Sequence, residues 1–173
     1  MNGPTTVVRA DIRDPEAVLT HPEVTGFIDF TQPVGLLAVA VLHFVTDQED
    51  PHMVVARWRE AMAPGSYLML SHITGEGTTR AEADQVIAIM CNGMADPPTL
   101  RGHAEVRHFF DGFELLDPDL VAVHRWRPEG NDPQTLRRTP DGADEPFWMY
   151  AGVGTTPPHD PRQRRTGRAR RAR

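Results

Sequence analysis

The chain has 173 residues, of which 39% are hydrophobic, and its formal net charge is -6. This length suits a single domain with a core of ordinary size. All 18 basic residues are arginine and seven of them lie within the last twelve positions, so an acidic body precedes a basic tail. We expect residues 1–156 to fold and residues 157–173 to form a disordered, Arg-rich tail.

Composition excludes several classes of protein. The most apolar run, VGLLAVAVLHFV at Val34–Val45, is shorter than the roughly 20 residues of a membrane-spanning helix. The first thirty residues contain no secretory signal, so we expect a cytoplasmic protein without a membrane partner. The single Cys91 excludes an intrachain disulfide, and we expect a buried, inert thiol. The tail has no aromatic residue to stack on bases, so a nucleic-acid partner is not expected.

The first part of the chain predicts a strand, a helix and a second strand. Thr5–Ile12 is rich in β-branched residues, which favour a strand. Asp14 as a cap and Pro15 at the first helical position predict a short helix over Pro15–Leu19. Val34–Val45 is apolar without interruption, which predicts a strand buried on both faces of a parallel sheet.

The middle of the chain continues this alternation. Asp50 and Pro51 repeat the cap and proline, and a helix follows; Ser66–Ile73 predicts the next strand. Thr79 and Glu82 have the spacing of a capping box for another helix. Apolar residues at helical spacing predict the buried faces of the two helices: Met53, Val54, Trp58, Ala61 and Met62 in the first, and Ala83, Val86, Ile87, Met90 and Met94 in the second.

The last third predicts a helix over His103–Phe110, ended by Gly112, and then two strands without a helix between them. These strands are Phe113–Arg127 and Phe147–Gly154, joined by a surface loop over Pro128–Glu145. The order of elements predicts an α/β fold with an open, mostly parallel sheet, helices on both faces and an antiparallel strand near the C-terminal edge.

Three polar residues end predicted strands, and open α/β sheets bind ligands at the carboxyl ends of their strands. Asp11 can accept hydrogen bonds from an adenine amino group or ribose hydroxyls; the alternative is a turn or cap aspartate. His43 and His72 end neighbouring strands. Each can serve as a general base, and the alternative for each is a structural residue with satisfied hydrogen bonds.

Two further motifs have a plainer interpretation. The GEG triplet at residues 75–77 precedes a helix and can cradle a phosphate, but it lacks the full glycine fingerprint and a Walker lysine, so we expect a turn. The acidic residues Glu49 and Asp50 with His52 can be drawn as metal ligands. The capped start of a helix explains them better, and we expect no metal.

A resemblance to a known family rests on five segments: ADIRDPEAVL (Ala10–Leu19), QPVGLLAVAVLHFVTDQEDP (Gln32–Pro51), PGSYLMLSHIT (Pro64–Thr74), FFDGFELLDPDLVAVHRWRP (Phe109–Pro128) and WMYAGVG (Trp148–Gly154). Together they resemble a family of S-adenosylmethionine-dependent methyltransferases from high-GC bacteria, formerly catalogued as a domain of unknown function. The resemblance covers roughly residues 5–156.

The resemblance implies the class I methyltransferase fold, a Rossmann-like sheet with strand order 3-2-1-4-5-7-6. The strand predicted at Thr5–Ile12 corresponds to strand 3, Val34–Val45 to strand 4 and Ser66–Ile73 to strand 5; the last two correspond to strands 6 and 7. Strands 1 and 2, with the glycine-rich cofactor loop, have no counterpart. The resemblance therefore implies the C-terminal two-thirds of a domain, N-terminally truncated, with strand 4 as an unpaired edge.

The resemblance also implies S-adenosylmethionine as cofactor, with an unidentified small molecule as methyl acceptor. Asp11 and Ile12 would approach the adenine, Val41 and Leu42 at the end of strand 4 would flank the cofactor, and His43 or His72 would remove a proton from the nucleophile. Because half of the cofactor site lacks a counterpart, we expect this chain alone to bind the cofactor weakly or not at all. The alternative is a non-catalytic module or remnant that pairs through the strand 4 edge, with self-association as one outcome.

Overall fold

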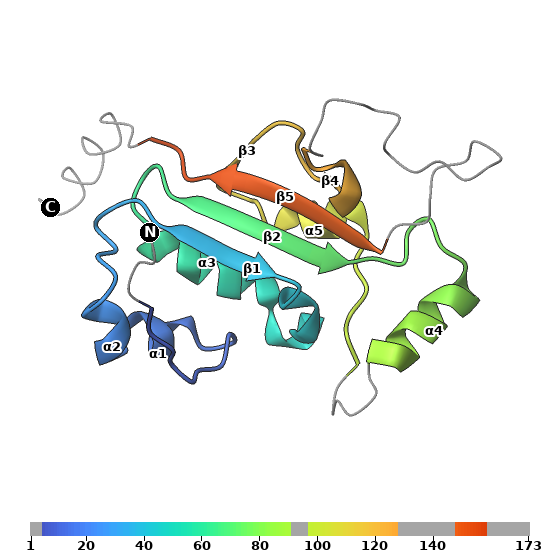
Figure 1. The fold of residues 1–173 in the computed structure, drawn as a ribbon, viewed down its shortest axis with the longest axis horizontal. Helices are drawn as coiled ribbons and strands as arrows, with labels where there is room; N and C mark the ends of the chain where they lie inside the picture. The colour runs from blue at the N-terminus through green and yellow to red at the C-terminus, as the bar shows by residue number, and fades with distance from the viewer. Residues whose placement is uncertain (1–4, 91–96, 128–147, 159–173) are drawn as a thin grey trace, which may run out of the picture.

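The computed structural model describes residues 5–90, 97–127 and 148–158 (Figure 1). The helices are α1 (Pro15–Leu19), α2 (Pro22–Thr25), α3 (Pro51–Ala61), α4 (Arg80–Met90) and α5 (His103–His108). The strands are β1 (Gly35–Val39), β2 (Tyr67–Ile73), β3 (Glu114–Leu115), β4 (Val121–Ala122) and β5 (Met149–Thr155). Short 3-10 turns are η1 (Leu42–Phe44), η2 (Asp47–Glu49) and η3 (Val123–Arg125).

The strands form one mixed sheet in the order β1-β2-β5-β3, and β4 also pairs with β5. β1 runs parallel to β2, in a register that extends from Gly35 opposite Tyr67 to Val39 opposite Ser71. β5 is antiparallel to β2, β3 and β4. The α/β class and the antiparallel strand near the C-terminal edge are confirmed. Within the described residues, parallel pairing is confined to β1 and β2, so the sheet is partly parallel and not mostly parallel as expected.

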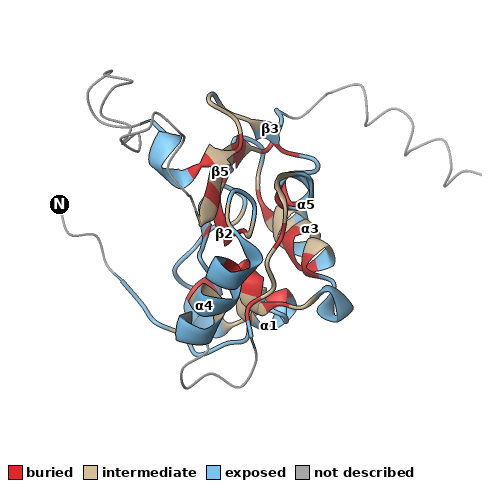
Figure 2. Cartoon of the chain, turned by 90° about the vertical axis from the view of Figure 1, so that its right-hand side faces the viewer, coloured by how far each residue is buried: buried red, intermediate tan, exposed pale blue. Residues whose placement is uncertain are grey.

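The helices α3 and α5 lie against the same face of the sheet (Figures 1 and 2). The core lies between these layers, where Val55 of α3 and Phe109 after α5 join Leu68 of β2 in one buried cluster. On the other face, Leu37 is 63% exposed and Val39 is 56% exposed. The expectation that this strand is buried on both faces is therefore wrong for the described part of the chain.

The helix starts predicted at Asp14, Asp50 and Thr79 are confirmed, since each has its side-chain cap. The helix predicted from His103 also begins there, but its cap position is Gly102, which has no side-chain cap. Asp14 accepts a hydrogen bond from the N–H of Ala17, and Asp50 accepts one from the N–H of Met53. Thr79 and Glu82 exchange hydrogen bonds as a capping box. The predicted buried face of α3 is wrong at Met53, which is 55% exposed, because Val54 and Val55 face the core instead.

The strand predicted at Val34–Val45 is shorter than expected. β1 ends at Val39, and Ala40 adopts a left-handed backbone conformation with φ of 51°. The chain then forms η1, in which Leu42 and His43 are buried. The apolar residues after Val39 thus reflect burial in a turn, which a short apolar run does not distinguish from burial in a strand.

The strand predicted at Thr5–Ile12 is wrong. This segment forms no β-bridge to any described strand, and Val7 is 86% exposed. Strand preference depends on a partner and on burial, so β-branched residues alone do not make a strand.

The strand predicted at Phe113–Arg127 is also wrong as one unit, because it is divided into β3, β4 and η3. Pro118 has no N–H to donate to a ladder, and Asp119 has φ of 75°, so the chain turns between β3 and β4. The prediction for β5 is confirmed, and Gly112 after α5 has the expected positive φ of 83°.

Several predictions fall on residues outside the described ranges: the thiol of Cys91, Met94, the loop over Pro128–Glu145 and most of the Arg-rich tail. Among the helices that the structure describes, none has the length and apolar character needed to cross a membrane.

Packing of β5 against the turn after α5 leads to a first prediction. A Cβ atom at Gly154 would lie 2.8 Å from Cβ of Phe113 and 3.0 Å from a ring atom of Phe110. Gly154→Ala should lower the free energy of unfolding by about 1–3 kcal/mol, because Cβ of Phe113 cannot move without the backbone. Urea unfolding measures this change.

The matched control is Gly35→Ala, whose new Cβ would meet only the flexible end of Met69 at 3.3 Å. It should change stability less than Gly154→Ala. Equal stability of the Gly154→Ala variant and the wild type would contradict the packing of β5.

Candidate functional site

The parallel pairing of β1 and β2 brings the carboxyl ends of both strands to the same end of the sheet. The N–H of Ala40 donates to the hydroxyl of Ser71 at 3.0 Å, which ties the end of β1 to β2. Residues 99–101 cross both ends: the N–H of Thr99 donates to the carbonyl of His43 at 2.7 Å, and that of Arg101 to the carbonyl of Ile73. The two strand ends are thus held by a third segment.

A pocket with a cavity volume of about 300 Å³ lies between the N-terminal segment, β1 and α3. Asp11, Ile12 and Leu42 line it, so three of the four predicted cofactor residues share one cavity. The fourth, Val41, packs beside the core and does not line the pocket. Most of the remaining wall is aliphatic, with contributions from Val8, Val18, Leu36, Val55 and Leu68.

Asp11 is ion-paired with its near neighbour Arg13. The guanidinium of Arg13 donates to both carboxylate oxygens, at 2.8 Å from Nε and 2.7 Å from Nη2. These hydrogen bonds lower the pKa of Asp11 to about 2. Arg13 also donates to Glu49 at 2.7 Å. The carboxylate at the pocket is therefore charged at neutral pH, with part of its acceptor capacity already used.

A second, larger apolar pocket of about 570 Å³ lies at the start of β1, near α2. Phe27 and Phe30 line it, and Trp58 lines both pockets. Sequence reasoning missed this cavity. The only available signal was a pair of phenylalanines in a segment without regular periodicity.

His43 and His72 come together as predicted, with ring centroids 5.6 Å apart and an edge-on arrangement. Both rings are almost completely buried, and neither lines the 300 Å³ pocket. Burial is the main cause that lowers the pKa of each histidine to about 4, and the nearby Arg101 adds to the effect. Neither ring nitrogen of His43 has a hydrogen-bond partner among the described residues.

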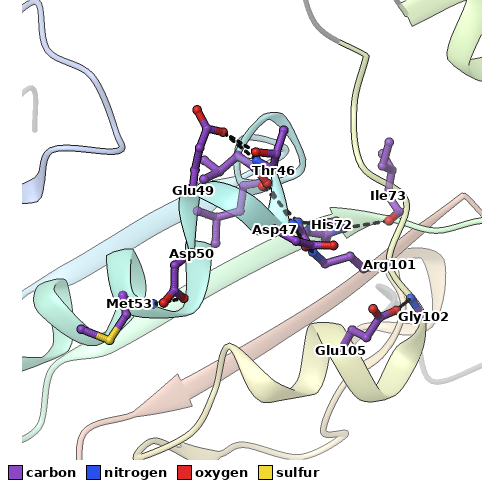
Figure 3. Close-up of polar contacts among 12 residues, drawn as sticks. Thr46, Asp47, Glu49, Asp50, Met53, His72, Ile73, Arg101, Gly102 and Glu105 are labelled. Atoms are coloured by element: carbon purple, nitrogen blue, oxygen red, sulfur yellow. Dashed lines mark hydrogen bonds and ion pairs between the residues drawn. The ribbon is translucent and has the colours of Figure 1, made fainter.

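The hydrogen bonds of His72 define its tautomer. Nε2 lies 2.9 Å from Nη1 of Arg101, and a guanidinium can only donate, so Nε2 is the acceptor. Nδ1 lies 2.7 Å from the carbonyl oxygen of Ile73, so the proton is assigned to Nδ1 (Figure 3). His72 is therefore a neutral histidine with both ring nitrogens satisfied.

Arg101 is a functional candidate that sequence reasoning missed. Its residue is only 2% exposed, although arginine is almost never fully buried unless it is paired. The surrounding PPTLRG sequence has no periodicity, so no local signal predicts burial at this position.

The alternative of a metal site at residues 49–52 has no support in the described ranges, where no group of three or more potential ligands is arranged to hold a metal ion. Glu49 instead caps η2 by accepting from the N–H of Thr46 at 2.8 Å. Asp50 caps α3, and the ring of His52 stacks on Phe109 with centroids 4.4 Å apart.

The GEG triplet forms a turn, in which the hydroxyl of Thr78 donates to the carbonyl of Gly75 at 2.8 Å. Its Glu76 accepts from the N–H of His103 at 3.0 Å and from the hydroxyl of Tyr150. The turn thus links the end of β2 to the start of α5.

Comparison with known proteins identifies similar chains. The model of a family described as S-adenosyl methyltransferase matches residues 1–157. No curated protein matches the chain.

Two solved structures are similar in both sequence and fold. A DUF574 family protein from Streptomyces avermitilis is 37% identical over 87% of this chain, with a TM-score of 0.75. A proposed methyltransferase from Thermobifida fusca is 31% identical over 86% of this chain, with a TM-score of 0.71. The matches cover 54% and 52% of those two proteins, so this chain spans about half of their length.

The buried histidines predict how stability depends on pH. In the folded chain the pKa values of His43 and His72 lie near 4, below the ordinary 6.5. At pH values between 4 and 6.5 the unfolded chain binds more protons than the folded chain. The contribution to stability is therefore fully present above pH 6.5 and falls as the pH falls. The loss should be on the order of 2 kcal/mol for each histidine by pH 5, measured by urea unfolding.

His72→Gln should reduce this pH dependence, because glutamine does not titrate. The control is His21→Asn, at the cap of α2 and outside the buried pair, which should reduce the dependence less. Constant stability between pH 7.5 and 5 would contradict the neutral, buried state of the two rings.

Proposed function

Because the chain belongs to the S-adenosyl methyltransferase family, we propose that it takes part in methyl transfer from S-adenosylmethionine to a small-molecule acceptor. The observation that carries this proposal is the cavity in which Asp11, Ile12 and Leu42 meet. The family match favours this function over a non-catalytic interaction module.

The 300 Å³ pocket suits the adenine end of the cofactor. Its volume lies at the lower end of the range for small-molecule sites. Aliphatic walls suit the faces of a purine ring, and the carboxylate of Asp11 can accept a hydrogen bond from the exocyclic amino group. Ile12 and Leu42 would hold the ring by apolar contact. When bound, S-adenosylmethionine supplies a methyl group on a positively charged sulfur.

The remainder of the cofactor has no comparable support in this pocket. Among the described residues that line it, Asp11 is the only charged one, so they offer no cation for the cofactor's carboxylate. Since the chain spans about half of its relatives, the proposal concerns the adenosine part. We therefore expect weak binding of S-adenosylmethionine by this chain alone.

A general-base role for His43 or His72 stays a prediction. A base must come within hydrogen-bond reach of the proton that it removes. Both rings are buried and neither lines the 300 Å³ pocket, so a base role requires the turn η1 to move.

NMR titration with adenosine tests the proposed site, because it detects binding in the millimolar range. The amide signals of Asp11, Ile12 and Leu42 should shift together. Inosine, which has a carbonyl oxygen in place of the amino group, should bind several-fold more weakly, because two acceptors would then face each other.

Asp11→Asn should reduce the preference for adenosine over inosine, because the amide side chain can also donate. The control is Asp29→Asn, outside the pocket at an exposed turn. Absence of shifts at Asp11, Ile12 and Leu42 with millimolar adenosine would overturn the proposed site. A micromolar dissociation constant for S-adenosylmethionine would overturn the expectation of weak binding.

We also propose that the chain associates with a second copy through the free edge of β1. Among the described strands, β1 pairs with β2 alone. The sequence of β1, GLLAV, contains no charge or proline of the kind that protects an edge from pairing. Val39 and Leu37 on this strand are more than half exposed.

Sedimentation velocity at increasing protein concentration tests this association. The wild type should show a concentration-dependent dimer, and Val39→Lys should weaken it because a charge opposes burial of the edge. Ile89→Lys on α4, where the native side chain is 69% exposed, is the matched control and should have no effect. A monomer at all concentrations would contradict the proposal.

A further inference from the structure

The buried guanidinium of Arg101 contacts the turn after β1 and the end of β2 at the same time. Nη1 donates to the carbonyl of Leu42 at 3.3 Å, and Nη2 donates to that of Val45 at 2.9 Å. Nη1 also donates to Nε2 of His72 at 2.9 Å. One side chain therefore joins two carbonyls of the turn to a side chain of the neighbouring strand.

Charge compensation comes from Asp47, which accepts from Nη2 of Arg101 at 2.6 Å and from Nε at 3.2 Å. The carboxylate is largely exposed while the guanidinium is buried. The guanidinium also lies 5.5 Å from the ring centre of Phe109. The acceptors around Arg101 thus come from residues 42–47 and from His72. Figure 3 shows two of them, Asp47 and His72.

The hydrogen bonds from Arg101 fix the backbone of the turn after β1. The carbonyls of Leu42 and Val45 are backbone groups, so donating to both fixes the backbone of the turn rather than one side chain. Leu42 also lines the 300 Å³ pocket. The position of that pocket wall therefore depends on the guanidinium.

We propose that Arg101 is a positioning residue that locks the turn at residues 42–47 against the end of β2, with His72 as its neutral hydrogen-bond acceptor. A planar guanidinium can serve several acceptors in fixed directions, which a lysine ammonium cannot reproduce. The lock sets the place of Leu42 in the pocket. This last step rests on the proposed function; the lock itself does not.

Hydrogen exchange of the full chain measures the lock without any ligand. In Arg101→Lys, the amides of Phe44 and Val45, which donate within the turn, should exchange about tenfold faster through local opening. The amides of β2 paired with β5 should keep their wild-type rates. Arg107→Lys on α5, a half-exposed arginine paired with Asp119, is the matched control and should change neither region.

Substitution of His72 separates its acceptor role from mere packing. His72→Gln retains an acceptor near the position of Nε2, whereas His72→Leu removes it. Exchange in the turn should be close to wild type in the glutamine variant and faster in the leucine variant. Equal exchange in these two variants would overturn the acceptor role.

Two results would overturn the lock itself: unchanged exchange in the turn of Arg101→Lys, or equal acceleration in the turn and in β2. Adenosine titration of the same variant tests the final step, with binding expected to weaken about threefold because the wall at Leu42 is mobile. If the wild type binds no adenosine, the proposed function fails while the exchange experiment still decides the lock.

Discussion

The parallel pairing of β1 with β2 is the constraint on which the rest of the structure depends. It brings the carboxyl ends of the two strands to the same end of the sheet, where the chain turns away from the sheet after each strand. The turn after β1 buries Leu42 and His43, and the end of β2 buries His72. These side chains meet because the strands run in the same direction, and an antiparallel pair would have separated them.

Burial at this end of the sheet removes backbone carbonyls of the turn from water, and Arg101 donates hydrogen bonds to them. The carbonyls of Leu42 and Val45 lie in a turn, outside the strand ladders. The carbonyl of Leu42 also accepts from the N–H of Val45, and an unpaired buried carbonyl is costly. A guanidinium supplies donors to both, yet it brings a charge into the interior. Asp47 and the acceptor nitrogen of His72 offset that cost. Losing part of such a network leaves buried polar groups unpaired. The complete network therefore favours one arrangement of the turn.

The parts of the fold that sequence reasoning predicted are those with local causes. The helices α1 and α3 begin where Asp14 and Asp50 cap them, and a cap needs only neighbouring residues. The parts that it missed depend on distant partners. The apolar run after Val39 resembles a strand in sequence but forms a turn, because apolar residues indicate burial and do not indicate the backbone conformation. The pairing of His43 with His72 was predictable from the order of strands, whereas Arg101 reaches its partners across more than 50 residues in several of its bonds.

The edge and the pocket share a residue, and this links their two proposed activities. Leu37 of β1 lines the 300 Å³ pocket, and it is 63% exposed on the strand along which a second copy would pair. A ligand that contacts Leu37 changes the surface that a second copy meets, and a second copy changes the wall that the ligand meets. Such coupling is reciprocal by thermodynamic necessity, so each event alters the other's affinity by the same factor. The lock that we propose for Arg101 acts on Leu42, whose carbonyl accepts its hydrogen bond, and not on Leu37. In the proposed scheme the two walls of one pocket are therefore controlled separately, one by the lock at Arg101 and the other by the state of the sheet edge.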